Sequence, residues 1–576
     1  MKGRKRIERS FTKLKNLNTL IDIYRTRPEK IVYKYFADDR SMISLTYSEF
    51  ADMICRQAAG FASLGLAGKR IAVIGETSPM WVSTYISAIL AGGIVIPLDK
   101  ELKMSEIEGF LEFSEADAVV FSQTFNDRFT NAAESHKTLK KFIPLTPEGC
   151  TITDSEKVVS FDEIIKLGEK ALSEGYTIPF ERDMERLAVM LFTSGTTGTS
   201  KCVMLCEKNV IAAVNSAIES VEFTEEDVIV SVLPIHHTYE LCIMISATAL
   251  GMEIGINDSL RHLLKNFQTF KPTGLILVPL FITTMNKRIL DTAKKNKKEK
   301  LLKVSLKASY ALRHVGIDVR KNLFKSVLDA FGGRLNKIIS GGAPLNPSLV
   351  HEFDEFGINI CEGYGITECS PLISVSPYYA VKPGSVGPAV ESCRVRIAPV
   401  SENAEPQINA KGFVEGEIQV KGDNVMLGYY KNEQATAETF TKDGWYCTGD
   451  IGYLDNDGYI FITGRKKSVI VLENGKNVFP EEIEEYLADV ESIAESVVVG
   501  RKSESGLEII LTAIVYPNFQ AFEENTDRSV IETKIKEDIN TLNKKLVSYK
   551  QIRAIEFRDT EFEKTTSRKI KRHLVK

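Results

Sequence analysis

Three features that commonly classify a protein are missing from this sequence: paired cysteines, a long apolar run and a large excess of charge of one sign. The nine cysteines, spread from Cys55 to Cys447, form no CxxC pair, so neither a zinc site nor a disulfide framework is predicted. The longest apolar run, residues 81–98, contains Ser, Thr, Gly and Pro, which indicates a core helix and strand instead of a membrane span. A net charge of -4 argues against a general nucleic-acid binder. A globular protein of a reducing cytoplasm, without nucleic acid as a partner, fits these absences.

The pattern that is present predicts a large α/β body. Residues 71–98 read as strand, helix and strand, which is the βαβ unit of a parallel sheet. Short apolar strands that alternate with helical stretches are expected at residues 118–121, 188–192, 228–232, 275–278, 337–340 and 359–361. Ligands of such sheets bind beyond the carboxyl ends of the strands, where Thr193 and Gly341 are expected.

The length of the chain and the change in its residue pattern along the sequence predict several domains. A chain of 576 residues exceeds what one hydrophobic core usually serves. We expect residues 1–382 to form an N-terminal body of two parallel-type α/β subdomains, and residues 383–465, which carry short β segments with turn signals, to form a small β-barrel. Residues 466–576 mix strands and helices and are expected to form a smaller α+β C-terminal domain.

One loop, residues 191–201 (LFTSGTTGTSK), has the composition of a polyphosphate-binding segment. Gly195 and Gly198 allow close backbone approach, and Lys201 adds a compact positive charge. Hydroxyl donors come from Thr193, Ser194, Thr196, Thr197, Thr199 and Ser200. The order is not that of a Walker loop, because the two glycines are three residues apart and Cys202 follows the lysine. A solvated turn would explain the same composition.

Three further segments favour the phosphate-binding interpretation, because together with the loop they resemble the motifs of one family. The loop, YGITE at 364–368, GWYCTGD at 444–450 with GRKK at 464–467, and KTTSRKIKR at 564–572 resemble, in order and spacing, the motifs of the adenylate-forming enzymes, including acyl-CoA synthetases. The resemblance begins at LTYSEF (45–50) and covers nearly the whole chain. It implies activation of a carboxylic acid by ATP, and mobility of the C-terminal domain.

The resemblance also implies where ATP and Mg²⁺ would bind. Glu368 and Thr196 match the positions that contact Mg²⁺, Tyr364 would lie near adenine, and Asp450 and Arg465 match the residues that hold the ribose. The complete set of positions expected to contact ATP or AMP is Thr193, Ser194, Gly195, Thr196, Thr197, Gly198, Lys201, Gly341, Gly342, Ala343, Pro344, Tyr364, Gly365, Thr367, Asp450, Arg465 and Lys569. Catalytic roles are expected for Lys569, Glu368, Thr367 and Lys201.

Two positions depart from the family pattern. Lys569 matches the lysine that contacts the substrate carboxylate and the α-phosphate, but Arg568 stands where glycine is usual. Ser200 replaces the usual proline before Lys201. These departures affect backbone angles more than phosphate contacts, although they leave open a non-catalytic relative that binds acyl groups or nucleotides.

The second half-reaction and the acyl pocket are likewise implied by the resemblance. Lys467 lies at the hinge position, and Gly475 matches the glycine beside which the pantetheine arm of CoA passes. LPIHHTYE at 233–240 resembles the segment beside the acyl tunnel, so His237 and Tyr239 are expected there; this form is most similar to bacterial long-chain fatty-acid–CoA ligases. Transfer to an acyl carrier protein, or activation of an aryl or medium-chain acid, is the alternative.

Two basic segments bear on partners and location. Residues 1–17 are basic but precede no apolar stretch, so a secretory signal is not expected. Residues 294–307 (KKNKKEKLLKVSLK) form a dense basic run on a predicted helix. A solvated face explains both segments; contact with anionic lipid or with CoA phosphates is the alternative. We expect a cytoplasmic protein, with peripheral contact to the inner membrane face left open.

Overall fold

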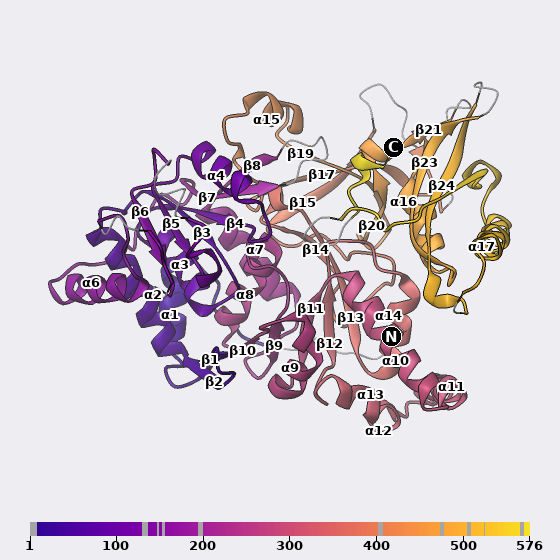
Figure 1. Cartoon of the computed structure of the whole chain (residues 1–576), viewed down its shortest axis with the longest axis horizontal. Coiled ribbons are helices and arrows are strands. Elements are labelled where there is room, and N and C mark those ends of the chain that lie inside the picture. Colours follow the sequence, from indigo (N-terminus) through magenta and orange to yellow (C-terminus); the bar gives the residue numbers. More distant parts are fainter. Residues whose placement is uncertain are drawn as a thin grey trace. The chain divides into compact units, whose positions relative to one another are not determined.

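The computed structural model describes residues 9–129, 136–146, 149–152, 156–193, 200–400, 407–409, 411–472, 477–503, 508–523, 525–564 and 570–575. The chain forms two compact units, which are coloured along the sequence in Figure 1. The larger unit comprises Met1–Gly195, Thr199–Arg394 and Lys421–Gly444. The smaller unit comprises Thr196–Gly198, Val395–Val420 and Trp445–Lys576.

One sheet of the larger unit has seven strands in the order β18-β8-β7-β4-β3-β5-β6. Its parallel strands are β3 (Arg70–Ile74), β4 (Ile94–Leu98), β5 (Ala118–Phe121), β6 (Lys141–Pro144) and β7 (Leu187–Thr193). β8 (Lys201–Cys206) returns antiparallel to β7, and the two-residue β18 (Gly428–Tyr429) pairs antiparallel with β8. Helices α4 (Met104–Phe113) and α6 (Phe161–Ser173) belong to the same half of this unit. The Val- and Ile-rich strands are buried, as expected of a parallel sheet.

The other sheet has eight strands in the order β14-β13-β12-β11-β9-β10-β1-β2. Six are parallel: β1 (Ile31–Phe36), β9 (Val228–Ser231), β10 (Glu253–Ile256), β11 (Gly274–Leu277), β12 (Lys337–Ser340) and β13 (Asn359–Gly365). Antiparallel strands β2 (Met42–Thr46) and β14 (Leu372–Val375) form the two edges.

Helices link the two sheets into one unit. α7 (Glu207–Ser220) contacts β14 of one sheet and β8 of the other, and α8 (Thr238–Leu250) packs against α7, β10 and α1 (Asn18–Arg25). α8 is apolar on nearly every side, which is typical of a helix buried between layers. α2 (Tyr47–Ser63) packs on α6 and on α3 (Pro79–Leu90), which contacts β3 and β4.

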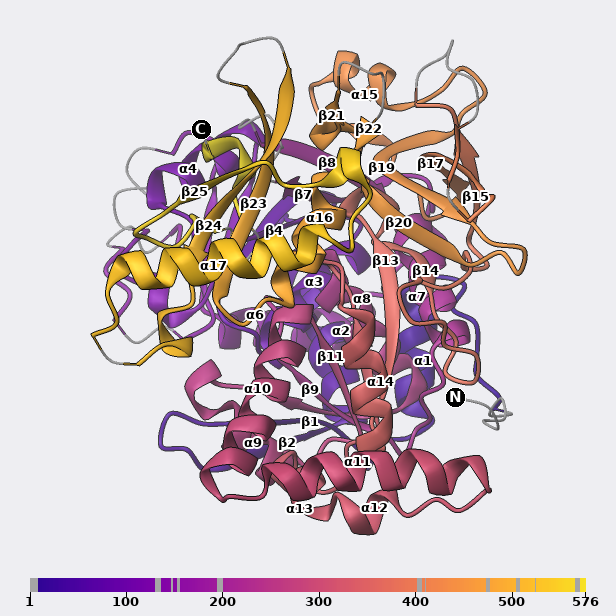
Figure 2. The same ribbon diagram turned by 90° about the vertical axis from the view of Figure 1, so that its right-hand side faces the viewer.

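A second helical layer covers the outer face of the eight-stranded sheet. It contains α9 (Leu263–Phe270), α10 (Pro279–Lys295), α11 (Glu299–His314), α12 (Arg320–Leu323), α13 (Lys325–Ala330) and α14 (Pro347–Phe356). Phe267, Leu328 and Phe353 from these helices join Leu275 and Ile338 from the strands in one core. Figure 2 shows α11 running across α14 at the edge of the larger unit.

The smaller unit contains a β-rich part followed by an α+β part. β15 (Cys393–Ala398), β17 (Val414–Gly422), β19 (Tyr446–Leu454) and β20 (Ile460–Arg465) form one sheet, with β16 (Gln407–Ile408) on β17. Beyond it lie the ribbon β21 (Ile470–Val471) and β22 (Asn477–Val478), and the sheet β23 (Ile493–Lys502), β24 (Ile509–Pro517) and β25 (Ala554–Phe557). Helices α16 (Pro480–Ala488) and α17 (Arg528–Asn543) contribute Ile483, Leu487, Ile535 and Ile539 to its core.

The predicted multidomain α/β fold, with a large body of parallel sheets and a smaller C-terminal domain, is confirmed. The boundaries at residues 382 and 465 stay predictions. The basic run at residues 294–307 differs from the expected single helix, because α10 ends at Lys295 and α11 begins at Glu299. Lys297, at a φ of 57°, makes this break. Among the described residues, no helix is both long and apolar enough to cross a membrane.

Candidate active site

The hairpin of β7 and β8 holds the two ends of the predicted phosphate-binding loop. Thr193 and Lys201 are cross-strand partners, and Thr193 Oγ1 lies 3.4 Å from the Lys201 carbonyl oxygen, to which it donates. The loop therefore leaves and re-enters the sheet at the carboxyl end of β7, where α/β sheets bind ligands. The residues between, which include Ser194, Gly195, Thr196, Thr197 and Gly198, lie outside the described residues, and their contacts stay predictions.

Tyr429 connects two of the predicted site residues. Its ring centroid lies 4.4 Å from Lys201 Nζ, and its hydroxyl donates a 2.9 Å hydrogen bond to Glu368 Oε1. β18 places Tyr429 opposite Val203, and the backbone N–H of Met426 donates to the Glu368 carbonyl oxygen at 2.8 Å. The side chain predicted to bind Mg²⁺ and the one predicted to bind phosphate thus share one aromatic neighbour. Tyr429 is not predicted by the sequence motifs, because a Gly-Tyr-Tyr string carries no signal of its own.

The YGITE segment forms a tight turn after β13. Tyr364 is buried, and the following residue must be glycine, because a Cβ on Gly365 would lie 2.0 Å from the Pro371 carbonyl oxygen. Thr367 begins a 3-10 turn that presents Glu368, which is partly exposed. In the described part of the chain no three His, Cys, Asp or Glu side chains gather as a metal site. The single carboxylate of Glu368 fits a Mg²⁺ ion whose other ligands are phosphate oxygens and water.

The segment after β12 lies against the predicted acyl pocket. A Cβ on Gly341 would lie 2.9 Å from both Cζ and the hydroxyl oxygen of Tyr239, so the tyrosine from α8 rests on the bare backbone there. The Tyr239 and Ser340 hydroxyls are buried, and neither has a hydrogen-bond partner within the described residues. Two buried hydroxyls without partners next to one glycine are consistent with a binding site in which a ligand supplies the missing hydrogen bonds. Gly342, Ala343 and Pro344 follow, and all three are exposed.

Two neighbouring histidines lie at the start of α8. His237 occupies the N-cap position, and its ring centroid lies 4.2 Å from that of His236. His236 Nε2 is 3.5 Å from Asp99 Oδ2, and burial holds the pKa of this imidazole well below its ordinary value, with lesser contributions from the charges of His237 and Lys100. The two imidazoles therefore lie side by side at the start of α8, and His236 is held neutral there.

Glu240, in the first turn of α8, is mostly neutral at physiological pH. Its side chain is fully buried, which raises its pKa to about 8, and the hydrogen bond that the Ser231 hydroxyl donates to Oε1 lowers the pKa only in part. A carboxyl group in this environment is mostly protonated at pH 7. Glu240 therefore adds little negative charge to the region between β9 and α8 at this pH.

The predicted ribose residues form a cross-strand pair in the smaller unit. Asp450 on β19 faces Arg465 on β20, and Arg465 Nε lies 3.1 Å from Asp450 Oδ1. Asp450 is buried, whereas half of the Arg465 side chain is exposed. The Thr448 hydroxyl accepts a hydrogen bond from the Asp450 N–H at 3.0 Å. These contacts hold the buried Asp450 carboxylate in a fixed position beside Arg465.

The remaining predicted residues lie at or near segments outside the described residues. Lys467 is exposed and lies in the 3-10 turn Lys466–Ser468 that follows β20. Lys569 and Gly475 lie outside the described residues, so their roles stay predictions. The segment that carries Lys569 is held at both ends: Lys564 and Ile570 form a β-bridge, and Arg572 Nη1 donates to Glu484 Oε2 at 2.6 Å.

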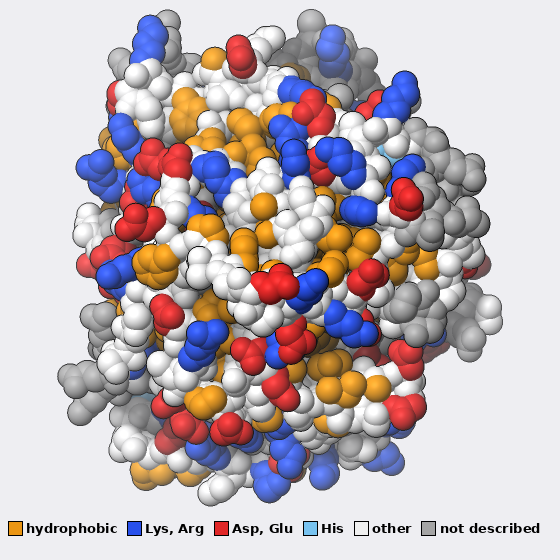
Figure 3. Space-filling model, turned by 90° about the vertical axis from the view of Figure 1, so that its left-hand side faces the viewer, with side chains coloured by type: hydrophobic (Ala, Val, Ile, Leu, Met, Phe, Trp, Pro, Cys, Tyr) orange, Lys and Arg blue, Asp and Glu red, His pale blue; other side chains and the backbone are white. Residues whose placement is uncertain are grey.

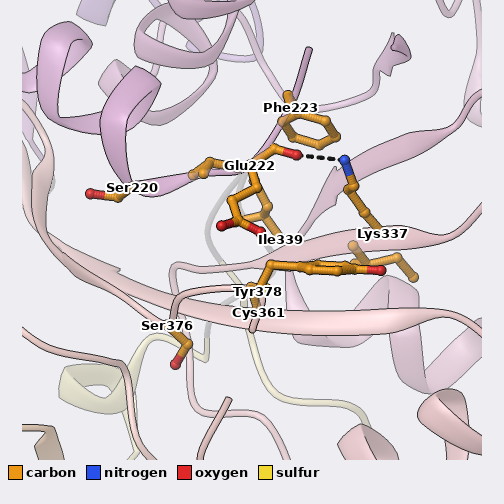
Figure 4. A pocket seen from close by; sticks show the side chains of 10 residues that line it. Ser220, Glu222, Phe223, Lys337, Ile339, Cys361, Ser376 and Tyr378 are labelled. Atoms are coloured by element: carbon orange, nitrogen blue, oxygen red, sulfur yellow. Dashed lines mark hydrogen bonds between the residues drawn. The ribbon is translucent and has the colours of Figure 1, made fainter. Parts of the chain in front are cut away.

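A small cavity in the larger unit is not part of this site. It encloses about 10 Å³, room for about one water molecule, and lies at the amino end of β12, whereas Gly341 follows the carboxyl end. Figure 4 shows Lys337 between the rings of Phe223 and Tyr378, with Nζ donating to the Glu222 carbonyl oxygen at 2.5 Å. The cavity is a packing feature around a shielded lysine.

Family models match most of the chain. The model of the AMP-binding enzyme family matches residues 23–430, and that of the AMP-binding enzyme C-terminal domain matches residues 467–576. The chain belongs to the AMP-binding enzyme family. As the sequence motifs predicted, it is a member of the adenylate-forming acyl-CoA synthetase superfamily. Enzymes of this family use ATP and CoA as co-substrates.

Curated relatives are similar over most of their length. The long-chain-fatty-acid–CoA ligase FadD15 of Mycobacterium bovis is 29% identical over 503 residues, which are 83% of this chain and 78% of the relative. Human long-chain-fatty-acid–CoA ligase 1 is 27% identical over 529 residues, which are 84% of this chain and 73% of the relative.

Solved structures show the same fold. ATP-bound MatB from Rhodopseudomonas palustris superposes with a TM-score of 0.73 at 24% identity, over 97% of this chain and 98% of that one. The o-succinylbenzoate CoA synthetase MenE of Bacillus subtilis, in complex with its acyl-adenylate, gives a TM-score of 0.69 at 22% identity, with 97% and 98% covered. This AMP-binding enzyme therefore has the adenylate-forming fold along nearly its whole length.

Proposed function

We propose that this AMP-binding enzyme is a fatty-acid–CoA ligase that acts on long-chain acids. A carboxylate oxygen of the acid attacks the α-phosphorus of ATP, pyrophosphate leaves, and the acyl-AMP then yields its acyl group to the thiol of CoA with release of AMP. The observation that carries the proposal is the cluster of Lys201, Tyr429 and Glu368 beside the phosphate-binding hairpin.

The first step brings several anionic groups together, so positioning and charge neutralisation supply most of the catalysis. Lys201 would neutralise phosphate charge, and Glu368, with the Thr196 and Thr367 hydroxyls nearby in the motifs, would hold Mg²⁺ against the phosphates. Asp450 and Arg465 would fix the ribose. Lys569 would contact the substrate carboxylate and the α-phosphate as the new bond forms.

The second step would follow a rearrangement of the C-terminal domain about Lys467, with Gly475 beside the pantetheine arm of CoA. The family's use of ATP and CoA supports this order. A carrier-protein acceptor is the second candidate, and we propose the cytoplasm as the location.

The neutral side chains of His236 and Glu240 favour an acid whose chain is apolar. Burying an ionised side chain beside such a chain would cost free energy. The relatives named as long-chain-fatty-acid–CoA ligases favour the same class of acid. Chain length is therefore the part of the proposal that experiment should address first.

The test is release of pyrophosphate and AMP with ATP, Mg²⁺ and acids from acetate to oleate, with and without CoA. Continuous release of both products, fastest with long acids and CoA, is expected. Pyrophosphate released only in single-turnover amounts, indifferent to CoA, would indicate a carrier-protein acceptor. No release with any acid would indicate a non-catalytic relative.

Lys569→Ala tests the assigned role within the same assay. Adenylation should fall by orders of magnitude while ATP still binds, and the neighbouring Lys571→Ala should keep most of the activity. Unchanged turnover in Lys569→Ala would remove this residue from the mechanism.

A further inference from the structure

The outer face of α11 carries an apolar line that the described part of the chain leaves in solvent. Leu301 and Val304 of α11 and Val315, the C-cap residue of this helix, expose 61%, 62% and 71% of their surface. With the exposed Ala308 and Ala311 they follow a spacing of three, four, three and four residues, which places them along one side of the helix. Single exposed apolar residues are ordinary, but a continuous line of them marks an interaction surface.

The inner face of α11 is already committed to the protein. Leu302 and Leu306 pack on the core of the helical layer. The Ser309 hydroxyl and Arg313 Nη1 donate to Glu355 of α14, at 3.0 and 2.7 Å. These contacts fix the rotation of the helix, so the apolar line cannot turn inward.

Lysines run beside the apolar line. Residues 294–307 contain seven lysines and one glutamate, and Lys300, Lys303 and Lys307 lie on one flank of the line. Glu299 pairs with Lys303 at 2.7 Å, which leaves the segment strongly positive. On the side of the molecule shown in Figure 3, by contrast, basic and acidic side chains are interspersed. The surface of α11 is therefore predominantly positive.

We propose that α11 is a docking surface for an anionic lipid bilayer. A helix with an apolar line and a lysine flank lies in the plane of the interface, with its apolar side chains at the acyl boundary and its ammonium groups at the phosphates. A second copy of the chain would place lysines against lysines, and nucleic acid would offer nothing to the apolar line. The inference deepens the proposed function, since long-chain acids partition into bilayers, but its test does not require activity.

Sedimentation of the purified chain with vesicles tests the proposal. The protein should sediment with vesicles that contain phosphatidylglycerol, much less with vesicles of phosphatidylcholine alone, and less as salt is added. The double variant Lys300→Glu/Lys307→Glu should lower the vesicle partition coefficient by about tenfold or more. Leu301→Ser/Val304→Ser should weaken binding without changing its salt dependence.

Lys166→Glu/Lys170→Glu is the matched control, because these lysines are also exposed on a helix, α6, and the charge change is the same. It should bind vesicles as the unaltered chain does. Equal loss in both charge variants, or no binding to anionic vesicles, would overturn the proposal; the second result would favour an acidic protein as the partner.

Pyrophosphate release, measured without vesicles on the same preparations, separates the two proposals. The α11 variants should retain it, which also shows that they are folded. Vesicle binding without release under any condition would reject the ligase and leave the docking surface standing.

Discussion

Tyr429 donates a hydrogen bond of 2.9 Å to Glu368 Oε1 while Lys201 Nζ lies 4.4 Å from its ring centroid. One side chain therefore fixes a carboxylate by its hydroxyl and an ammonium group by its ring. The hydrogen bond leaves Glu368 Oε2 for another ligand and removes the freedom of the side chain to turn away. Tyr429 is a positioning residue in this arrangement.

Tyr429→Phe should raise the Mg²⁺ concentration that supports half-maximal activity by about tenfold, because a hydrogen bond to a charged group is lost while the ring remains beside Lys201. Calorimetric ATP binding should weaken in the presence of Mg²⁺ and stay unchanged without it. Tyr430→Phe is the control, since Tyr430 bonds to Glu115 and not to Glu368. An unchanged Mg²⁺ dependence would show that Glu368 needs no such support.

Gly341→Ala should destabilise the larger unit by about 1–3 kcal/mol, because the new methyl group would press on Tyr239. Tyr239→Leu removes the ring atoms concerned, so the double variant should lose less stability than the two single changes together. Urea unfolding measures this coupling. Gly109→Ala, where a Cβ meets nothing within 4 Å, should be neutral or slightly stabilising; additive effects at Gly341 and Tyr239 would contradict the assigned contact.

Glu240→Gln should flatten the dependence of stability on pH. The folded state keeps the carboxyl protonated up to a pKa of about 8, whereas the unfolded chain releases the proton near pH 4.5. The folded state thus binds more protons in this window, and stability is full below about pH 4.5 and declines as pH rises towards 8.

Unfolding in urea at pH 5, 6.5 and 8 measures this decline, which should be smaller in Glu240→Gln, because glutamine keeps an acceptor for Ser231 and does not ionise. Glu438→Gln, an exposed change on α15 (Glu433–Thr439), should keep the original slope. Identical slopes in Glu240→Gln and the unaltered chain would place the titration elsewhere.

Asp450→Asn should raise the KM for ATP by about tenfold or more, because the ribose hydroxyls and Arg465 would lose a buried negative charge. The matched change is Asp559→Asn, which also breaks an aspartate–arginine pair of this unit but at an exposed position, with Asp559 2.6 Å from Arg528. KM measured at saturating acid and CoA distinguishes the two. An equal effect of both changes would refute the ribose role of Asp450.

The sequence predicted the strands that carry the site because each is short, apolar and followed by a motif with its own composition. The predicted strands at 118–121 and 337–340 match β5 and β12. The contact of Tyr239 with Gly341 could not be predicted from the sequence. The two segments lie about a hundred residues apart and meet only because of the order of the strands in the sheet. The break at Lys297 was missed for another reason: lysine has no preference for the left-handed region, so the packing of the chain decides it.

β18 pairs with a hairpin that lies more than 200 residues earlier in the chain. A ribosome that has released only the first 420 residues has produced both strands of that hairpin but not Tyr429, their last neighbour. The edge of the sheet that is predicted to bind phosphate therefore stays incomplete until late in synthesis, although its central strands are available early. In this enzyme the order of translation keeps the nucleotide site unfinished until nearly the whole larger unit has been made.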